Sequence, residues 1–343
     1  MTEPIELRAP SKTVLEVRNL TVEFKKGHTV TRVVDGVSFK AVSGKTLAIV
    51  GESGSGKSVT SLALMGLLDP KNAAVTGDLV RFAPEGAAPL DLLTLPDKAM
   101  LSIRGSKLTM VFQEPMTSLN PSLTLEYQVG EVLRVHKGAS KREARASAIA
   151  MLERVGIPDA PRRADSYPHE MSGGMRQRVM IATALICSPS LLIADEPTTA
   201  LDVTIQAQIL GELRKLQQDV GMSMIFITHD LGVVAEIAHG VVVMYAGQVV
   251  EQGTVADILK RPRHPYTLAL LASVPRVERA PNAKLESIPG RMPDPQQVIV
   301  GCRFNTRCPF CLHGLCDTKK PELELTEAEH SVRCFRWREL EAA

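Results

Sequence analysis

The chain has 343 residues, of which 44% are hydrophobic and 23% charged, and its formal net charge is +2. This length allows one large domain or two ordinary ones with a full core, and the near-neutral charge does not indicate nucleic-acid binding. The first 12 residues contain Glu3, Glu6 and two prolines; they lack the apolar segment of a signal peptide. No run approaches the ~18 apolar residues of a membrane span. We therefore expect a soluble, intracellular protein that could dock on a membrane protein.

Three strands are predicted near the N-terminus. Residues 15–24 mix β-forming and polar residues with a break near Asn19, which predicts a strand, and residues 33–39 are its expected partner. Residues 46–50 are short and apolar, as is typical of a buried parallel strand.

The segment after this third strand reads Gly51-Glu-Ser-Gly-Ser-Gly-Lys-Ser58 and leads into a predicted helix. A strand, a glycine-rich loop of this pattern and a helix together predict a phosphate-binding loop. Backbone N–H groups and the helix N-terminus bind phosphate oxygens, Lys57 reaches the β- and γ-phosphates, and Ser58 holds Mg²⁺. A chance match is disfavoured because the strand and the helix are both present. The predicted nucleotide contacts of this segment are Ser53, Gly54, Ser55, Gly56, Lys57, Ser58 and Val59.

The middle of the chain is predicted to be largely helical. Residues 83–96 indicate a surface excursion, and residues 108–112 a short strand that ends at Gln113. Residues 114–180 favour helices, with a capping box that starts at Ser140. Ser172-Gly-Gly174 opens another helix and predicts a second anion site at its N-terminus. One triphosphate does not need two such sites in one chain, so two chains arranged head to tail would explain both.

A further predicted strand, residues 191–194, is followed by two carboxylates. Asp195 can bind Mg²⁺, and Glu196 can take a proton from an attacking water. A helix over residues 204–220 and a strand over residues 224–228 follow, and His229 comes directly after that strand. Prolines near residues 261–265 indicate a boundary, and after residue 275 the chain becomes rich in proline and cysteine.

These motifs occur in the order found in ATP-binding cassette (ABC) ATPases. Residues 51–58, Gln113, Ser172-Gly-Gly-Met175, residues 191–196, Ala200-Leu-Asp202 and His229 resemble that family's Walker A, Q-loop, signature, Walker B, D-loop and H-loop. The resemblance covers about residues 14–260. The signature has Met175 where the family more often has Gln, but the Ser and both Gly are kept, so we expect phosphate binding to survive.

The resemblance implies a role for each matching residue. Glu196 would be the general base, Gln113 would sense Mg²⁺ and the attacking water, and His229 would contact the γ-phosphate. Phe24 would stack on adenine, although a strand Phe is more often part of a core, and Asp202 would face a partner subunit. The implied Mg²⁺ contacts are Ser58, Gln113 and Asp195. The implied contacts to the nucleotide of a partner chain are Ser172, Gly173, Gly174 and Met175.

Narrower motifs resemble the ATPase subunits of dipeptide and oligopeptide importers, namely residues 113–121, 194–204 and 263–275. This likeness implies ATP hydrolysis that drives peptide import. It implies as partners two membrane permease subunits, a second and related ATPase subunit and an extracytoplasmic solute-binding protein, at the cytoplasmic face of a bacterial inner membrane. Nickel importers share much of the pattern and are an alternative. A soluble non-transport ABC ATPase and a phosphate-loop kinase or GTPase are further alternatives.

Five of the six cysteines fall between residues 302 and 334. This clustering favours metal ligands over a disulfide framework, with free thiols as the alternative. Four thiolates can bind Zn²⁺ or an iron–sulfur cluster, and some peptide-importer ATPases carry a [4Fe–4S] cluster on a similar pattern. Their second gap is one residue shorter and lacks the extra cysteine, so Cys311 and Cys316 remain alternatives. The predicted ligands of the cluster are Cys302, Cys308, Cys316 and Cys334.

We therefore expect an α/β fold: a P-loop ABC cassette with a helical subdomain and an antiparallel β-subdomain, plus a small Cys-rich C-terminal unit. The predicted domains are an ATP-binding domain, residues 1–265, and a C-terminal peptide-importer-type domain, residues 266–343. Because the cysteines lie outside the cassette in sequence, Cys308→Ser is expected to disturb the C-terminal unit more than the ATP site.

Overall fold

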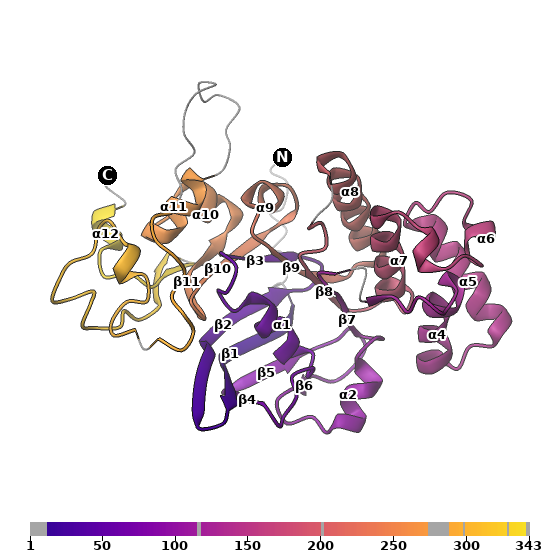
Figure 1. Cartoon of the computed structure of the whole chain (residues 1–343), viewed down its shortest axis with the longest axis horizontal. Coiled ribbons are helices and arrows are strands. Elements are labelled where there is room, and N and C mark those ends of the chain that lie inside the picture. The colour runs from indigo at the N-terminus through magenta and orange to yellow at the C-terminus, as the bar shows by residue number, and fades with distance from the viewer. Residues whose placement is uncertain are drawn as a thin grey trace, which may run out of the picture.

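Two β-sheets form the centre of the molecule (Figure 1). The computed structural model describes residues 12–114, 118–199, 202–273, 288–297, 299–327 and 329–340. Within these ranges the larger sheet has eight strands in the order β12-β13-β11-β10-β3-β9-β8-β7. Its parallel strands are β7 (Leu108–Val111), β8 (Leu191–Asp195), β9 (Ser223–Thr228), β3 (Thr46–Val50) and β10 (Gly240–Tyr245). The remaining strands are β11 (Gln248–Thr254), β12 (Glu324–Glu327) and β13 (His330–Val332).

Both faces of this sheet are covered, which explains why its parallel strands are almost entirely apolar. Leu191 and Ile193 of β8 face an apolar cluster shared with the smaller sheet. Leu192 and Ala194 face the opposite cluster, which contains residues of α7 (Gly173–Leu185) and α8 (Val203–Val220). The predicted buried strands at residues 46–50 and 191–194 are therefore confirmed.

The smaller sheet is antiparallel and has the order β2-β1-β5-β6, with β4 also paired to β1. Its strands are β1 (Thr13–Lys26), β2 (Thr29–Val42), β4 (Ala73–Thr76), β5 (Leu79–Phe82) and β6 (Leu90–Asp91). The predicted pairing of the first two strands is confirmed, since Val17 pairs with Phe39. Asn19 takes a left-handed φ of 52° where the register shifts, so the expected break is a bulge within one long strand.

The helical segment projects from one end of the molecule, and the C-terminal unit lies at the opposite end (Figure 1). The segment contains α4 (Leu125–Lys137), α5 (Lys141–Arg154), α6 (Ala160–Arg163), a 3-10 helix (Pro168–Glu170) and α7. The capping box is present: Ser140 accepts from the N–H of Glu143, whose side chain accepts from the N–H of Ser140. The other helices are α1 (Lys57–Leu64), α2 (Asp97–Ile103), α9 (Leu231–Ile237), α10 (Val255–Lys260), α11 (Pro265–Ala272), a 3-10 helix (Asn305–Arg307) and α12 (Trp337–Leu340). None of the helices in the described ranges is long and apolar enough to cross a membrane.

The C-terminal unit is joined to the cassette by its backbone as well as its side chains. Strand β13 pairs with β11, with Val332 opposite Glu251. Glu251 is fully buried and accepts hydrogen bonds from the backbone N–H groups of Arg263 and His264 at 2.6 and 3.1 Å. Its side chain also lies 2.8 Å from Nε2 of His330. The division at residue 265 remains a sequence prediction, but the strands on either side of it belong to one sheet.

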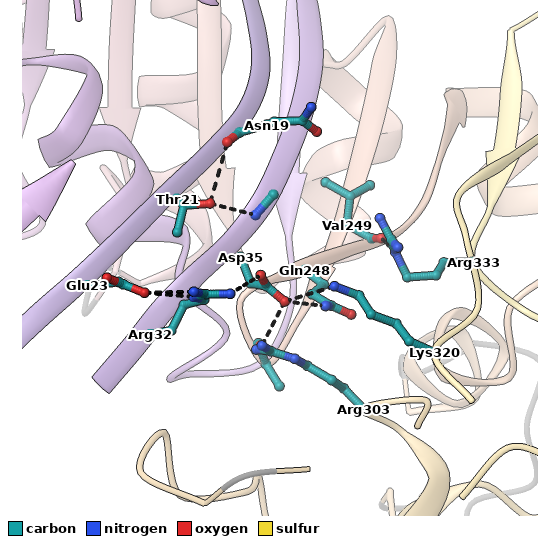
Figure 2. A network of polar contacts seen from close by, with 12 residues as sticks. Asn19, Thr21, Glu23, Arg32, Asp35, Gln248, Val249, Arg303, Lys320 and Arg333 are labelled. Carbon is teal, nitrogen blue, oxygen red and sulfur yellow. Dashed lines mark hydrogen bonds and ion pairs between the residues drawn. The ribbon is translucent and has the colours of Figure 1, made fainter. Parts of the chain in front are cut away.

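A second attachment of the C-terminal unit is centred on Asp35 of β2 (Figure 2). Its Oδ2 accepts from Gln248 at 2.6 Å, from Arg303 at 2.9 Å and from Lys320 at 3.1 Å. Burial opposes ionisation, but these donors and the charge of Arg303 lower the pKa of Asp35 to about 2. The ionised carboxylate therefore holds the C-terminal unit against the antiparallel sheet.

Asp35→Asn is expected to lower the free energy of unfolding by about 1–3 kcal/mol, because charged hydrogen bonds are lost. The folded-state pKa is depressed, so this contribution is present above pH ~4 and is lost as the pH falls toward 2. Urea unfolding at neutral and acidic pH measures both effects. Asp165→Asn breaks an exposed pair with Arg145 and is the control, which should change the unfolding midpoint much less. Equal effects of the two substitutions at neutral pH would contradict this role of Asp35.

Candidate functional site

The predicted functional side chains meet at the carboxyl ends of neighbouring parallel strands. The phosphate loop follows β3, His229 follows β9, Glu196 follows β8, and Gln113 lies two residues after β7. Ligand sites of open α/β sheets form at this edge. The fold thus brings together residues that are up to 178 positions apart, from Gly51 to His229.

The phosphate loop requires glycine at positions where a side chain would collide. Gly51, Gly54 and Gly56 have φ angles of 152°, 82° and 99°, which L-residues rarely adopt. A Cβ at Gly51 would overlap the backbone oxygen of Met244, and one at Gly56 would lie 3.0 Å from the oxygen of Val33. The loop is therefore bent tightly and leads directly into α1.

Lys57 is held inside this loop. Its side chain is buried, and its Nζ donates to the carbonyl oxygens of Gly51 at 2.7 Å and Glu52 at 3.0 Å. Burial lowers the pKa of the Lys57 amine, and the carboxylates of Glu196 and Asp195 act in the opposite direction. A cation in a loop of N–H donors is suited to bind phosphate oxygens.

Ser58 and Asp195 form the second part of the site. The Ser58 hydroxyl donates to Oδ1 of Asp195 at 3.1 Å, and burial is the main reason that the pKa of Asp195 is raised. A hydroxyl and a carboxylate this close together supply two oxygen ligands of the kind that Mg²⁺ prefers. The donor set therefore fits Mg²⁺.

Glu196 is held by three neighbours. Its Oε2 lies 3.3 Å from Nε2 of Gln113, 3.4 Å from Nδ1 of His229 and 2.8 Å from Oγ1 of Thr199. Glu196 also has a left-handed φ of 45°, a conformation that costs energy and is often found at functional sites. The structure thus brings the three predicted catalytic residues together, with Gln113 and His229 beside the carboxylate of Glu196.

Thr199 is a member of this site that sequence reasoning did not identify. It lies in the Glu196-Pro-Thr-Thr199 turn, where its backbone N–H bonds to the carbonyl of Glu196 at 3.1 Å. The hydroxyl then reaches the Glu196 side chain. The only sequence signal was a hydroxyl residue three positions after the carboxylate, a spacing typical of local side-chain bonds in turns.

The signature residues lie on the helical segment, away from α1 in the central core (Figure 1). Ser172 caps α7 by accepting from the N–H of Met175, and both Ser172 and Gly173 are exposed. Asp202 caps α8 by accepting from the N–H of Ile205 at 2.9 Å. Ala200 and Leu201, the first two residues of the D-loop motif, lie outside the described residues.

Phe24 lies on β1, half-buried, and packs against the apolar cluster between the sheets. Near it a cavity of about 320 Å³ is bounded by the β1–β2 hairpin, by Gly54 of the phosphate loop and by residues 293–297. Arg32 and Arg303 also line this cavity, but Phe24 is not among its lining residues. Base stacking by Phe24 stays a prediction.

Four cysteines of the C-terminal unit line one small cavity, namely Cys302, Cys308, Cys316 and Cys334. Cys311 does not line it. Burial, together with the neighbouring thiols, raises the pKa of Cys308 to about 11 and that of Cys334 to about 12. In the part of the chain that the structure describes, no group of three or more His, Cys, Asp or Glu side chains is arranged to hold a metal ion.

Comparison with known proteins agrees with this geometry. Residues 34–199 match the family model described as ABC transporter, and residues 250–316 match that of the oligopeptide/dipeptide transporter C-terminal region. The dipeptide transport ATP-binding protein DppD of Bacillus subtilis is 51% identical over 94% of this chain and 94% of its own length. The chain belongs to the peptide-import ATP-binding proteins of the ABC family. The oligopeptide transport ATP-binding protein AppD of B. subtilis is 48% identical over 95% of this chain and 98% of its own length.

A solved structure shows the same cassette. The ATP-binding cassette MJ0796, in a dimeric post-hydrolysis state bound to ADP and Pi, is 28% identical to this chain, with a TM-score of 0.61. The match covers 70% of this chain and 98% of MJ0796. This ABC ATPase therefore has the predicted cassette fold, and the kinase and GTPase alternatives are ruled out.

Proposed function

We propose that this ABC ATPase hydrolyses ATP to drive peptide import through a membrane permease. The observation that carries the proposal is the contact of Gln113 and His229 with Glu196, next to the pair formed by Ser58 and Asp195. A phosphate loop alone would only bind the nucleotide, whereas a carboxylate held beside it can accept a proton from an attacking water. The peptide as cargo is supported by the relatives named as dipeptide and oligopeptide transport proteins.

The site residues would have separate roles in ATP hydrolysis. The loop from Ser53 to Val59 and the Lys57 amine would bind the triphosphate, and Ser58 and Asp195 would hold Mg²⁺. When bound, Mg²⁺ neutralises the charge that develops on the phosphate oxygens. Glu196 would accept a proton from the attacking water on its carboxylate.

Two neighbours of Glu196 complete this arrangement. Gln113 would orient the attacking water, and His229, whose side chain is 62% exposed, could donate to a γ-phosphate oxygen. The adenine would lie toward the β1–β2 hairpin, with Phe24 as its stacking partner.

Ser172, Gly173, Gly174 and Met175 would act on a nucleotide bound to a second ATPase chain. The exposed N-terminus of α7 supports this role, because its N–H groups can bind an anion that approaches from outside. The dimeric state of MJ0796 supports it further. Asp202 would lie at the same interface. We infer that the second chain is a related but different ATPase subunit.

The other partners are two permease subunits and an extracytoplasmic solute-binding protein, which place the ATPase on the cytoplasmic face of a bacterial inner membrane. A groove of about 470 Å³ between the sheet and the helical segment supports permease docking. It is lined by Leu67 and Phe112, which are 38% and 39% exposed. Phe112 precedes Gln113, so a docked segment would lie next to the catalytic site.

The identity of the transported solute can be tested with the assembled transporter. ATP hydrolysis should rise when the solute-binding protein is loaded with a peptide and not when it is offered Ni²⁺. Stimulation by Ni²⁺ alone would favour the nickel-importer alternative. Co-purification with ribosomes or nucleic acid rather than permeases would favour a non-transport ATPase.

We also propose that Cys302, Cys308, Cys316 and Cys334 hold a [4Fe–4S] cluster with a structural role. The support is that these four thiols line one small cavity, as a single set of cluster ligands would. Four thiolates around one point would also suit Zn²⁺, which stays the alternative. The structural role follows because small units with few apolar residues often need a metal to fold.

Cys308→Ser is expected to remove most of the iron, because one of four thiolate ligands is lost. Cys311→Ser is the matched control and should keep its iron, since Cys311 does not line the cavity. Iron, sulfide and zinc analysis after anaerobic purification measures the outcome. Stoichiometric zinc without iron would show that the four thiolates hold Zn²⁺ instead of a cluster. Equal iron in the two variants would refute the predicted ligand set.

A further inference from the structure

Arg307 joins the C-terminal unit to the phosphate loop. It is the last residue of the 3-10 helix Asn305–Arg307 and its side chain is 3% exposed. Its Nη1 donates to Oε2 of Glu52 at 2.7 Å, and its Nη2 donates to Oε1 at 3.1 Å. Two parallel bonds between a guanidinium and a carboxylate form a strong and directional pair. Glu52 is the second residue of the phosphate loop.

The Arg307 side chain is fixed on its other sides as well. Its Nε donates to the carbonyl of Pro289 at 2.8 Å, and its guanidinium lies 5.8 Å from the centre of the Tyr245 ring. The Arg307 guanidinium is therefore already oriented toward Glu52 before nucleotide binds.

Glu52 is held through its backbone too. Its N–H donates to Oη of Tyr266 at 2.8 Å, and its carbonyl accepts from Nζ of Lys57 at 3.0 Å. The residue thus connects the C-terminal part of the chain with the amine that is predicted to bind the β- and γ-phosphates.

An acidic residue in a phosphate loop needs a counter-charge. The ionised Glu52 carboxylate would repel the triphosphate, since like charges in a partly buried site interact strongly. Arg307 neutralises Glu52 through the paired bonds, so the loop keeps its preference for anions. Local sequence motifs do not predict this pair, because 255 positions separate the two residues.

Both contacts to Glu52 also lead to the cavity lined by Cys302, Cys308, Cys316 and Cys334, here called the thiol cavity. Arg307 is the chain neighbour of Cys308, and Tyr266 follows His264 and Pro265; Cys308, His264 and Pro265 all line that cavity. Phe304, another lining residue, lies 5.4 Å from the ring of Tyr266. The two groups that hold Glu52 thus lie next to the thiol cavity, Arg307 along the chain and Tyr266 through the Phe304 ring.

We propose that Arg307 is a positioning residue for ATP, which neutralises and orients Glu52 of the phosphate loop and makes nucleotide affinity depend on the state of the thiol cavity. On this proposal Cys308→Ser would also affect the ATP site, although the sequence predicts a larger effect on the C-terminal unit. Cys308 is far from the phosphate loop along the chain, but its neighbour Arg307 contacts Glu52 directly.

Equilibrium binding of Mg-ATP to the purified full-length chain tests the first part. Arg307→Met replaces the guanidinium by an apolar side chain of similar length and should weaken binding about tenfold, because the Glu52 charge is left unpaired. Glu52→Gln added to Arg307→Met should restore most of the affinity, since the repelling charge is gone. Lys320→Ala is the control: it removes another ion pair between the C-terminal unit and the cassette, at Asp35, and should leave the affinity unchanged.

Purely structural damage would not be repaired by Glu52→Gln, so failure of this rescue overturns the charge-neutralising role. Unchanged affinity in Arg307→Met overturns it as well. If Arg307→Met does not fold, Arg307→Lys keeps the charge without the paired geometry and should lower affinity by a smaller factor; wild-type affinity there contradicts the orienting role.

The link to the thiol cavity is tested by adding Cys308→Ser to two backgrounds. It should weaken ATP binding in the wild-type chain and have a clearly smaller effect in the Arg307→Met/Glu52→Gln chain, where the Arg307 connection is absent and only the one through Tyr266 remains. Equal weakening in both backgrounds, or none in the wild-type chain, overturns the link. These binding measurements require neither peptide nor permease, so their outcome is independent of the proposed transport function.

Discussion

Glu196→Gln is expected to lower ATP hydrolysis by about 10²–10⁴-fold, the usual contribution of acid–base catalysis. The amide cannot accept the proton that the carboxylate takes from water, but it keeps the size of the side chain and can still contact Thr199 and Gln113. ATP binding should persist, because Lys57 and Ser58 are unchanged. The measurements are the steady-state ATPase rate and the affinity for Mg-ATP in the assembled transporter.

Two further observations accompany this substitution. The closed dimer should accumulate with ATP bound, since binding continues while hydrolysis is slow. Glu236→Gln, on the exposed side of α9, is the control and should retain the normal rate. Near-normal turnover of Glu196→Gln in the assembled transporter would mean that another group activates the water.

Ser172→Arg is expected to lower hydrolysis at the partner chain's phosphate loop by about 10²–10³-fold, the range found when a donor to a developing anion is removed. The large side chain would occupy the exposed N-terminus of α7, where the partner's triphosphate is predicted to bind. Nucleotide binding at the same chain's Lys57 should not change. Single-turnover hydrolysis with each ATPase subunit mutated in turn measures the two sites separately.

Ser140→Arg provides a matched control for this prediction. Ser140 caps α5 on the same helical segment, so both substitutions remove a capping hydroxyl at a cost of about 1 kcal/mol. Only Ser172 belongs to the predicted composite site, and Ser140→Arg should therefore leave hydrolysis nearly unchanged. A full hydrolysis rate in the isolated monomer, independent of its concentration, would contradict a composite site.

The sequence by itself determined the ATP-binding cassette. The phosphate loop, the Asp195-Glu196 pair and His229 each follow a short apolar run, and such runs predict buried parallel strands. Because the carboxyl ends of parallel strands meet at one edge, motifs far apart in the chain could be assigned to one site without coordinates. The capping box at Ser140 was equally local, since its partner Glu143 is three residues away.

The tertiary structure decided how the C-terminal unit relates to this site. Two contacts show this: Arg307 contacts Glu52, and β13 pairs with β11. Both join parts of the chain with no periodic or local signal between them. Local sequence patterns report the burial and conformation of neighbouring residues. Contacts between distant segments depend on how strands pair and side chains pack, so the sequence placed the C-terminal unit outside the cassette, whereas the folded chain brings Arg307 onto the phosphate loop.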